Sequence, residues 1–106
     1  MSLEYTIQRQ GDTVTVFPEG DISLETVPAL REILRSVVDS RNGGRIDVNL
    51  NAVTFLDSAG IGVLIAARRG AAAKDTTLML CEPGPMIRMV LQIAGLDSLV
   101  AEPLSE

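Results

Sequence analysis

The stretch that decides the fold is RIDVNLNAVTFLDSAGIGVLI, residues 45–65. Its first six residues alternate between polar and apolar side chains, which is typical of a strand with one buried face. Thr54, Phe55 and Leu56 continue this strand as a short apolar run. From Ile61 onward the apolar residues recur at helical spacing. The stretch therefore predicts a strand that passes through a short polar turn into a helix.

The N-terminus shows the same two-residue alternation on either side of a turn. Residues 5–10 and 13–17 alternate polar and apolar side chains, and Gly11-Asp12 separates them. Alternation around a Gly-Asp turn is typical of an antiparallel β-hairpin. The chain is therefore expected to begin with two paired strands.

A first helix is expected after the hairpin, because the period changes beyond Pro18–Asp21. Thr26 as N-cap would place Pro28 in the first turn, where a missing N–H costs nothing. Asn42-Gly43-Gly44 would end the helix, since these residues adopt left-handed geometry easily. Arg31, Glu32, Arg35 and Asp39 would lie on its polar face. Its expected apolar stripe is Val27, Leu30, Ile33, Leu34, Val37 and Val38.

Two further helices follow. The second runs from Ile61 towards Lys74, and the third follows Pro83-Gly84-Pro85 and ends at Gly95. The expected apolar stripe of the second helix is Ile61, Leu64, Ile65, Ala67, Ala71 and Ala72. The expected stripe of the third helix is Met86, Met89, Val90 and Ile93.

The order of these elements predicts an α/β fold (α+β by some counts). Thr77–Cys81 is a candidate for a buried strand between the second and third helices, and Leu99–Ala101 for a last short one. Strands that alternate with helices pair in parallel through right-handed crossovers, while the first hairpin is antiparallel. Residues 45–50 keep one polar face, so the helices are expected on the other face of this mixed sheet.

Composition excludes several classes of function. The chain has no histidine, so it contains no Ser-His-Asp or Cys-His nucleophile pair. With Cys81 as its one cysteine it forms no internal disulfide and no cysteine-rich zinc site. A net charge of −5 argues against direct nucleic-acid binding. The longest uncharged apolar run, residues 59–67, is too short to span a bilayer. A cytoplasmic, non-enzymatic domain without structural metal is expected.

Four weaker candidate sites have simple structural explanations. Gly60-Ile61-Gly62 begins like a dinucleotide fingerprint but lacks its third glycine, so a turn that starts a helix close to the sheet is favoured. Cys81 lies in an apolar run, which predicts a small, inert core residue. The methionines Met79, Met86 and Met89 are interpreted as gap-filling core, or else as an adaptable apolar surface for a partner helix. The carboxylates Asp21, Asp47 and Asp57 are interpreted as a solvated face or as caps, in preference to acid–base or metal chemistry.

Asp57 and Ser58 form a polar pair between an apolar strand and an apolar helix. Either residue could be the N-cap of that helix, stabilising it by about 1 kcal/mol. Alternatively, the free N–H groups and positive dipole of the helix N-terminus would favour a phosphate on Ser58. The residues alone leave both possibilities open.

The same stretch resembles a known family. FLDSAGIGVL, residues 55–64, looks like the phosphorylation-site signature of STAS-domain anti-sigma-factor antagonists. Gly20–Ser23 resembles the family's second landmark, a loop before the first helix, and the strand at 46–50 lies where such proteins place it. The resemblance implies one STAS-like domain over residues 1–106, a mixed sheet with helices packed on one face. Residues 102–106 are too few for the closing helix that is common in the family.

The resemblance also implies a function that needs no cofactor. The unphosphorylated protein would bind an anti-sigma factor that is also a serine kinase, and phosphorylation of Ser58 would release it. Ala59 stands where the family often has a second Ser or Thr, which leaves Ser58 as the acceptor in this loop. Asp57 would position Ser58, while Gly60 and Gly62 would permit close approach of the partner. The expected partner-binding residues are Asp21, Ile22, Ser23, Asp57, Ser58, Ala59, Gly60 and Gly62.

Two alternatives remain open at this point. The chain could be a stand-alone STAS subunit of a transporter or signalling complex, with Ser58 acting only as a cap and contact. It could also be a nucleotide-binding protein that uses the glycine turn, although it lacks the lysine of a phosphate-binding loop. Membrane insertion is not expected. The sequence leaves the oligomeric state, the sigma factor and the existence of a cognate kinase undetermined.

Overall fold

The strands form one mixed sheet in the order β1-β2-β3-β5-β6, with β4 paired to β2 outside this path. The computed structural model describes residues 3–101. The strands are β1 (Glu4–Gln10), β2 (Thr13–Ile22), β3 (Arg45–Asn49), β4 (Val53–Leu56), β5 (Thr77–Cys81) and β6 (Val100–Ala101). The helices are α1 (Val27–Asp39), α2 (Ser58–Ala72), α3 (Pro85–Ile93) and the 3-10 turn η1 (Asp97–Leu99).

The pairing directions confirm the topology expected from the sequence. β1 and β2 are antiparallel, and Gly11 in their turn has a φ of 61°, which glycine adopts without strain. Every other pair is parallel, so the helices act as the crossovers between strands. Residues 102–106 were predicted to be too few for a closing helix. They lie outside the residues that the structure describes, so this stays a prediction.

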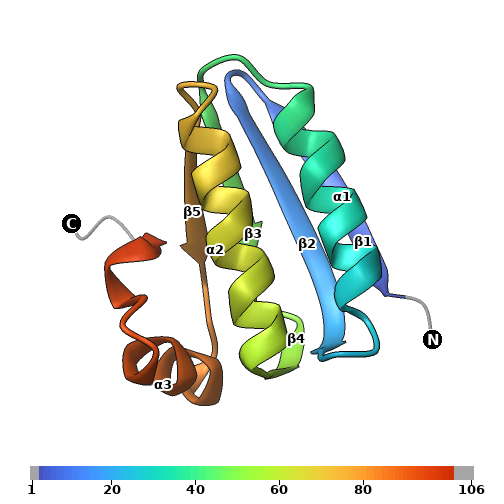
Figure 1. The fold of residues 1–106 in the computed structure, drawn as a ribbon, viewed down its shortest axis with the longest axis vertical. Coiled ribbons are helices and arrows are strands. Elements are labelled where there is room, and N and C mark those ends of the chain that lie inside the picture. Colours follow the sequence, from blue (N-terminus) through green and yellow to red (C-terminus); the bar gives the residue numbers. More distant parts are fainter. Residues whose placement is uncertain (1–2, 102–106) are drawn as a thin grey trace.

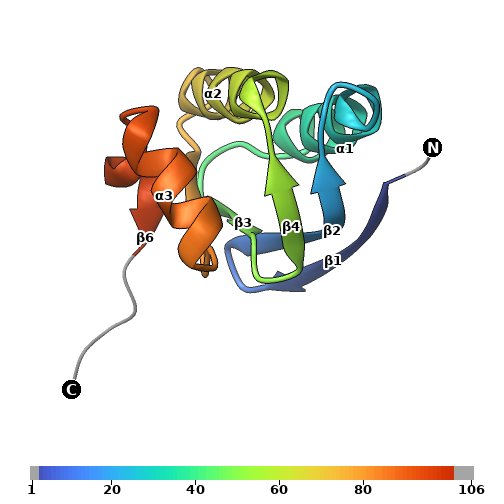
Figure 2. The same cartoon turned by 90° about the horizontal axis from the view of Figure 1, so that it is seen from below.

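The helices α1 and α2 lie side by side on one face of the sheet, whereas α3 lies beside β4 (Figures 1 and 2). Side chains of β2, β3 and β5 that face the helices are buried, among them Val16, Val48 and Leu80. They pack with Leu34 of α1 and Leu64 of α2 in one core. Among the described residues, no helix is long and apolar enough to cross a membrane.

Two local predictions at the end of the sheet are wrong. Gly20–Ile22 is the end of β2 and not a loop, and residues 53–56 form a strand of their own rather than an extension of β3. A register shift at Gly20, whose φ is 91°, separates the part of β2 that pairs with β3 from the part that pairs with β4. A bulge of this kind redirects a strand, and here it gives β2 a second neighbour.

The predicted apolar stripe of α3 is also wrong. Ile87 and Leu91 are its buried residues, whereas Met86, Met89 and Ile93 are 66%, 57% and 81% exposed. Val90, the fourth residue of the predicted stripe, packs partly buried against the core. Both faces of this short helix are apolar, so periodicity alone could not decide which one packs on the core. The interpretation of the two α3 methionines as gap-filling core is therefore incorrect.

The other two helices follow their predicted faces more closely. In α1 five of the six predicted apolar residues are buried, and Ile33 packs partly buried against the core. In α2 the prediction missed Val63, which is buried, and included Ala72, which is exposed. Because α2 packs against both α1 and β5, its buried surface is wider than one stripe.

Candidate functional site

The last residues of β2 and β4 bring two distant parts of the chain together. The two strands are parallel, and Ile22 stands beside Leu56. The backbone N–H of Asp57 donates a hydrogen bond of 3.1 Å to the carbonyl of Ile22. Parallel strands end at the same edge of a sheet, and here both chain segments turn upward into α1 and α2 (Figure 2).

Asp57 ties the two segments to each other through its side chain. Oδ1 accepts a hydrogen bond of 3.0 Å from the N–H of Gly60, which makes Asp57 the N-cap of α2. Oδ2 accepts one of 3.1 Å from the N–H of Leu24 in the segment before α1. Of the two N-cap candidates Asp57 is thus the cap, and Ser58 is the first residue of the helix. Asp57 fixes the position of Ser58 relative to the neighbouring segment.

Asp21 is held by two threonines. Its Oδ1 accepts a hydrogen bond of 2.7 Å from Thr54 of β4, and its backbone carbonyl accepts one of 2.9 Å from Thr26. Thr26 also accepts a hydrogen bond from the N–H of Ser23. The hydroxyl of Thr26 therefore orders the segment before α1 instead of capping the helix, although the helix begins after it as predicted. The role of Thr54 was not predicted because β4 was not identified, and Thr26 was predicted only as an N-cap.

The eight predicted site residues fall into three groups by exposure. Asp21, Ser58 and Gly62 are exposed, while Ser23, Asp57 and Ala59 are half-buried. The other two, Ile22 and Gly60, are buried. The site is thus one continuous arrangement in which buried residues support exposed ones.

Gly60 is required for the packing of α2 on the sheet. A Cβ atom at this position would lie 2.6 Å from Cγ2 of Ile22 and 2.7 Å from Cδ1 of Leu56. Real Cβ atoms essentially never approach so closely. By contrast, a Cβ at Gly62 would meet nothing within 4 Å. The interpretation of the glycine turn as a means of starting a helix close to the sheet is supported at Gly60.

Of the three predicted carboxylates, the fold brings only two to this end of the molecule. Asp21 and Asp57 belong to the paired segments, whereas Asp47 lies on the face of β3 away from the helices and pairs with Arg45. Within residues 3–101 no three His, Cys, Asp or Glu side chains gather in a way that could hold a metal ion. The carboxylates act here in hydrogen bonds that order the backbone.

Cys81 occupies a different environment from the predicted core. It is half-buried on the uncovered face of the sheet, where its neighbours on β3 include Asp47 and Arg45. Burial, and then the negative charge of Asp47, raise the pKa of the Cys81 thiol above its ordinary value, although Arg45 acts in the opposite direction. The core prediction is wrong, because in β5 the residues at 78 and 80 are the ones that face the helices.

The raised pKa predicts slow chemistry at this thiol. The thiolate is the reactive form, and at a pH near 8 less of it is present in the folded protein than in an unfolded chain. Iodoacetamide should therefore label Cys81 several-fold more slowly in buffer than in concentrated urea at the same pH. Equal rates in the two conditions, measured by mass spectrometry, would contradict this.

The chain matches known proteins over almost its whole length. The sequence model of the STAS domain family covers residues 4–106. The anti-sigma-B factor antagonist of Staphylococcus aureus is 30% identical over 101 residues, which cover 94% of this chain and 90% of that protein. The anti-sigma-B factor antagonist of Listeria monocytogenes is 26% identical over 93 residues, covering 88% and 81%.

Solved structures share the fold. An anti-sigma factor antagonist from Mycobacterium paratuberculosis superposes with a TM-score of 0.83 at 24% identity, covering 96% of this chain and 87% of that one. The unphosphorylated form of the anti-sigma factor antagonist SpoIIAA gives a TM-score of 0.79 at 22% identity, covering 96% and 90%. Together, the family match, the shared fold and the signature around Ser58 show that the chain belongs to the STAS domain family.

Proposed function

We propose that this protein is an anti-sigma-factor antagonist that works by switching partners in the cytoplasm, not as an enzyme. Without phosphate on Ser58 it binds an anti-sigma factor that is also a serine kinase, and phosphorylation of Ser58 ends the complex. The names of its relatives in Staphylococcus aureus and Listeria monocytogenes support the role of anti-sigma-factor antagonist. The observation that carries the proposed phosphorylation switch is the exposed position of Ser58 as the first residue of α2.

The chemistry of a helix N-terminus suits a phosphoserine. The first N–H groups of a helix have no partner within the helix, and together with the helix dipole they favour a negative group. In the proposed step the kinase transfers the terminal phosphoryl group of its bound ATP to Oγ of Ser58. The new O–P bond forms as the bond to ADP breaks, and a base of the kinase takes the hydroxyl proton.

The proposed partner surface consists of the exposed and half-buried site residues. These are Asp21, Ser23, Asp57, Ser58, Ala59 and Gly62. The buried Ile22 and Gly60 belong to the site as its support, since they set how closely α2 approaches β2 and β4. The filled space beside Gly60 also argues against a phosphate-binding glycine loop, which needs room for its ligand.

Substitution of Asp21 tests this surface. Asp21→Ala removes an exposed charge and the hydrogen bond from Thr54, so we expect it to weaken binding of the anti-sigma factor by about tenfold, or about 1.4 kcal/mol. Arg31→Ala and Arg35→Ala, which lie on α1 beside the pocket between α1 and α2, should bind within about twofold of the wild type. Calorimetric titration measures the affinities. If the two arginine variants lose affinity and Asp21→Ala does not, the surface has been placed on the wrong part of the molecule.

A further inference from the structure

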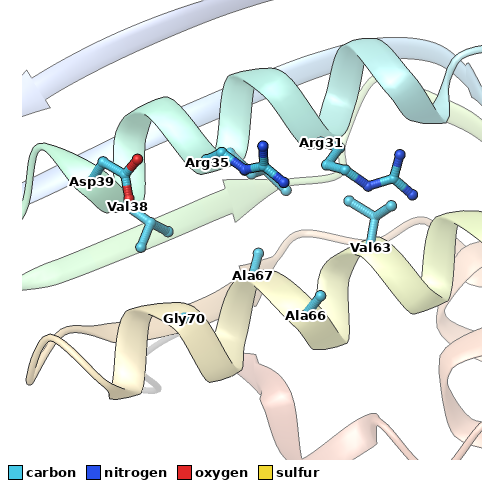
Figure 3. A pocket seen from close by; sticks show the side chains of 9 residues that line it. Arg31, Arg35, Val38, Asp39, Val63, Ala66, Ala67 and Gly70 are labelled. Atoms are coloured by element: carbon cyan, nitrogen blue, oxygen red, sulfur yellow. The ribbon is translucent and has the colours of Figure 1, made fainter.

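A cleft of about 310 Å³ runs between α1 and α2, away from the Ser58 site. Leu34 and Val38 of α1, with Val63 and Ala67 of α2, form its apolar walls. Arg31 and Arg35 lie along its α1 side, and Asp39 lies at the far end (Figure 3). The volume is at the lower end of the range of about 300–1,000 Å³ that is usual for small-molecule pockets.

The two arginines are not used by the fold. Neither makes a hydrogen bond or an ion pair with any residue between 3 and 101. They stand four residues apart on α1, and like charges at this spacing destabilise a helix. Arg9, Arg68 and Arg69 also lack such a partner among residues 3–101, but of these five arginines only Arg31 and Arg35 line the cleft. The pair therefore places two positive charges beside an apolar cleft.

The cleft is open because the α2 side carries small residues. Ala66, Ala67 and Gly70 line it, and none of them reaches across to α1. A Cβ at Gly70 would already contact Cγ1 of Val38 at 3.7 Å, so a single added methyl group would fill the space between these two residues. Larger apolar residues at these positions would fill the cleft and bury more surface.

We propose that this cleft binds a small amphipathic anion, with one carboxylate or phosphate group between Arg31 and Arg35 and a short apolar body along Val63, Ala67 and Gly70. Two guanidinium groups suit the oxygens of either anion. Asp39 at the other end of the cleft disfavours a second negative charge there. The ligand is thus apolar with one charged end. This site is separate from the partner switch and does not depend on it.

Titration with octanoate and octyl phosphate, followed by ¹H–¹⁵N NMR of the full chain, tests the proposal. Saturable shifts should appear at the amides of Val63, Ala67 and Gly70, and the tighter of the two ligands identifies the preferred head group. Octylammonium, which has the same apolar chain and the opposite charge, should bind at least tenfold more weakly. Equal binding of octylammonium, or shifts confined to other parts of the chain, would overturn the proposal.

Matched variants separate the charge from the cavity. The double variant Arg31→Gln/Arg35→Gln should bind the ligand at least tenfold more weakly. The double variant Arg68→Gln/Arg69→Gln makes the same charge change outside the cleft, and its affinity should stay within about twofold of the wild type. Ala67→Leu should abolish binding by filling the space. Circular dichroism and thermal melting measurements show whether each variant is folded. Unchanged affinity in the folded Arg31/Arg35 variant would also overturn the proposal.

Discussion

Replacing Ser58 with aspartate is expected to weaken binding of the anti-sigma factor by about 30- to several-thousand-fold while leaving the fold intact. The substitution puts a permanent negative charge next to Asp57 in the proposed interface. An uncompensated charge in an interface costs about 2–5 kcal/mol. On α2 the first basic residue after Ser58 is Arg68, ten residues away and roughly 15 Å along the helix. α2 itself therefore offers no cation near the new charge.

The same charge has little effect on the isolated domain. Ser58 is exposed at the beginning of α2, where a negative group stabilises a helix by about 0.3–1 kcal/mol. Ser58→Asp should thus keep the circular dichroism spectrum and melting temperature of the wild type. Ser58→Ala is the matched control, and it should bind whether or not ATP is present. Tight binding by Ser58→Asp, or a changed fold in the phosphorylated protein, would show that the switch works differently.

Replacing Gly60 with valine is expected to destabilise the protein by about 2–3 kcal/mol, because its side chain would have to enter the space of Ile22 and Leu56. Both of those side chains are buried in the core, so displacing either of them disturbs close packing. For a domain of this size the loss corresponds to a melting temperature lower by on the order of 10 °C. The displaced helix start would also move Ser58 relative to the segment before α1.

Gly62→Val makes the same substitution two residues later on α2. Gly62 is exposed, and a Cβ there meets nothing within 4 Å. The free energy of unfolding of the Gly62→Val variant should therefore stay within about 0.5 kcal/mol of the wild-type value. Chemical denaturation of the two variants measures the difference. If both substitutions cost the same, the effect belongs to the helix backbone and not to the contact with Ile22 and Leu56.

Local patterns in the sequence predicted the parts of the fold that depend on neighbouring residues. The hairpin around Gly11-Asp12 follows from two-residue alternation, and α1 begins after Thr26 with Pro28 in its first turn. Asp57 was one of two N-cap candidates for α2, and only the hydrogen bond from Gly60 decided between them. In each case the deciding interactions span only a few residues.

The parts that the sequence did not predict depend on residues far apart in the chain. The separate strand β4 exists because β2 bends at Gly20 and offers it a partner, which periodicity over residues 53–56 does not reveal. The hydrogen bonds from Leu24 to Asp57 and from Thr54 to Asp21 each join residues 33 positions apart. These two bonds bring the predicted landmarks together, and the assignment of their residues to a partner site stays a prediction.

The most direct test of the central claim is to incubate the purified protein with ATP and a candidate anti-sigma factor with serine kinase activity from the same organism, and to map the phosphate by mass spectrometry. The proposal predicts one phosphate, on Ser58, and none on the Ser58→Ala variant under the same conditions. It also predicts that the phosphorylated protein no longer binds that anti-sigma factor. Phosphate on a different residue, or undiminished binding after Ser58 is phosphorylated, would contradict the account.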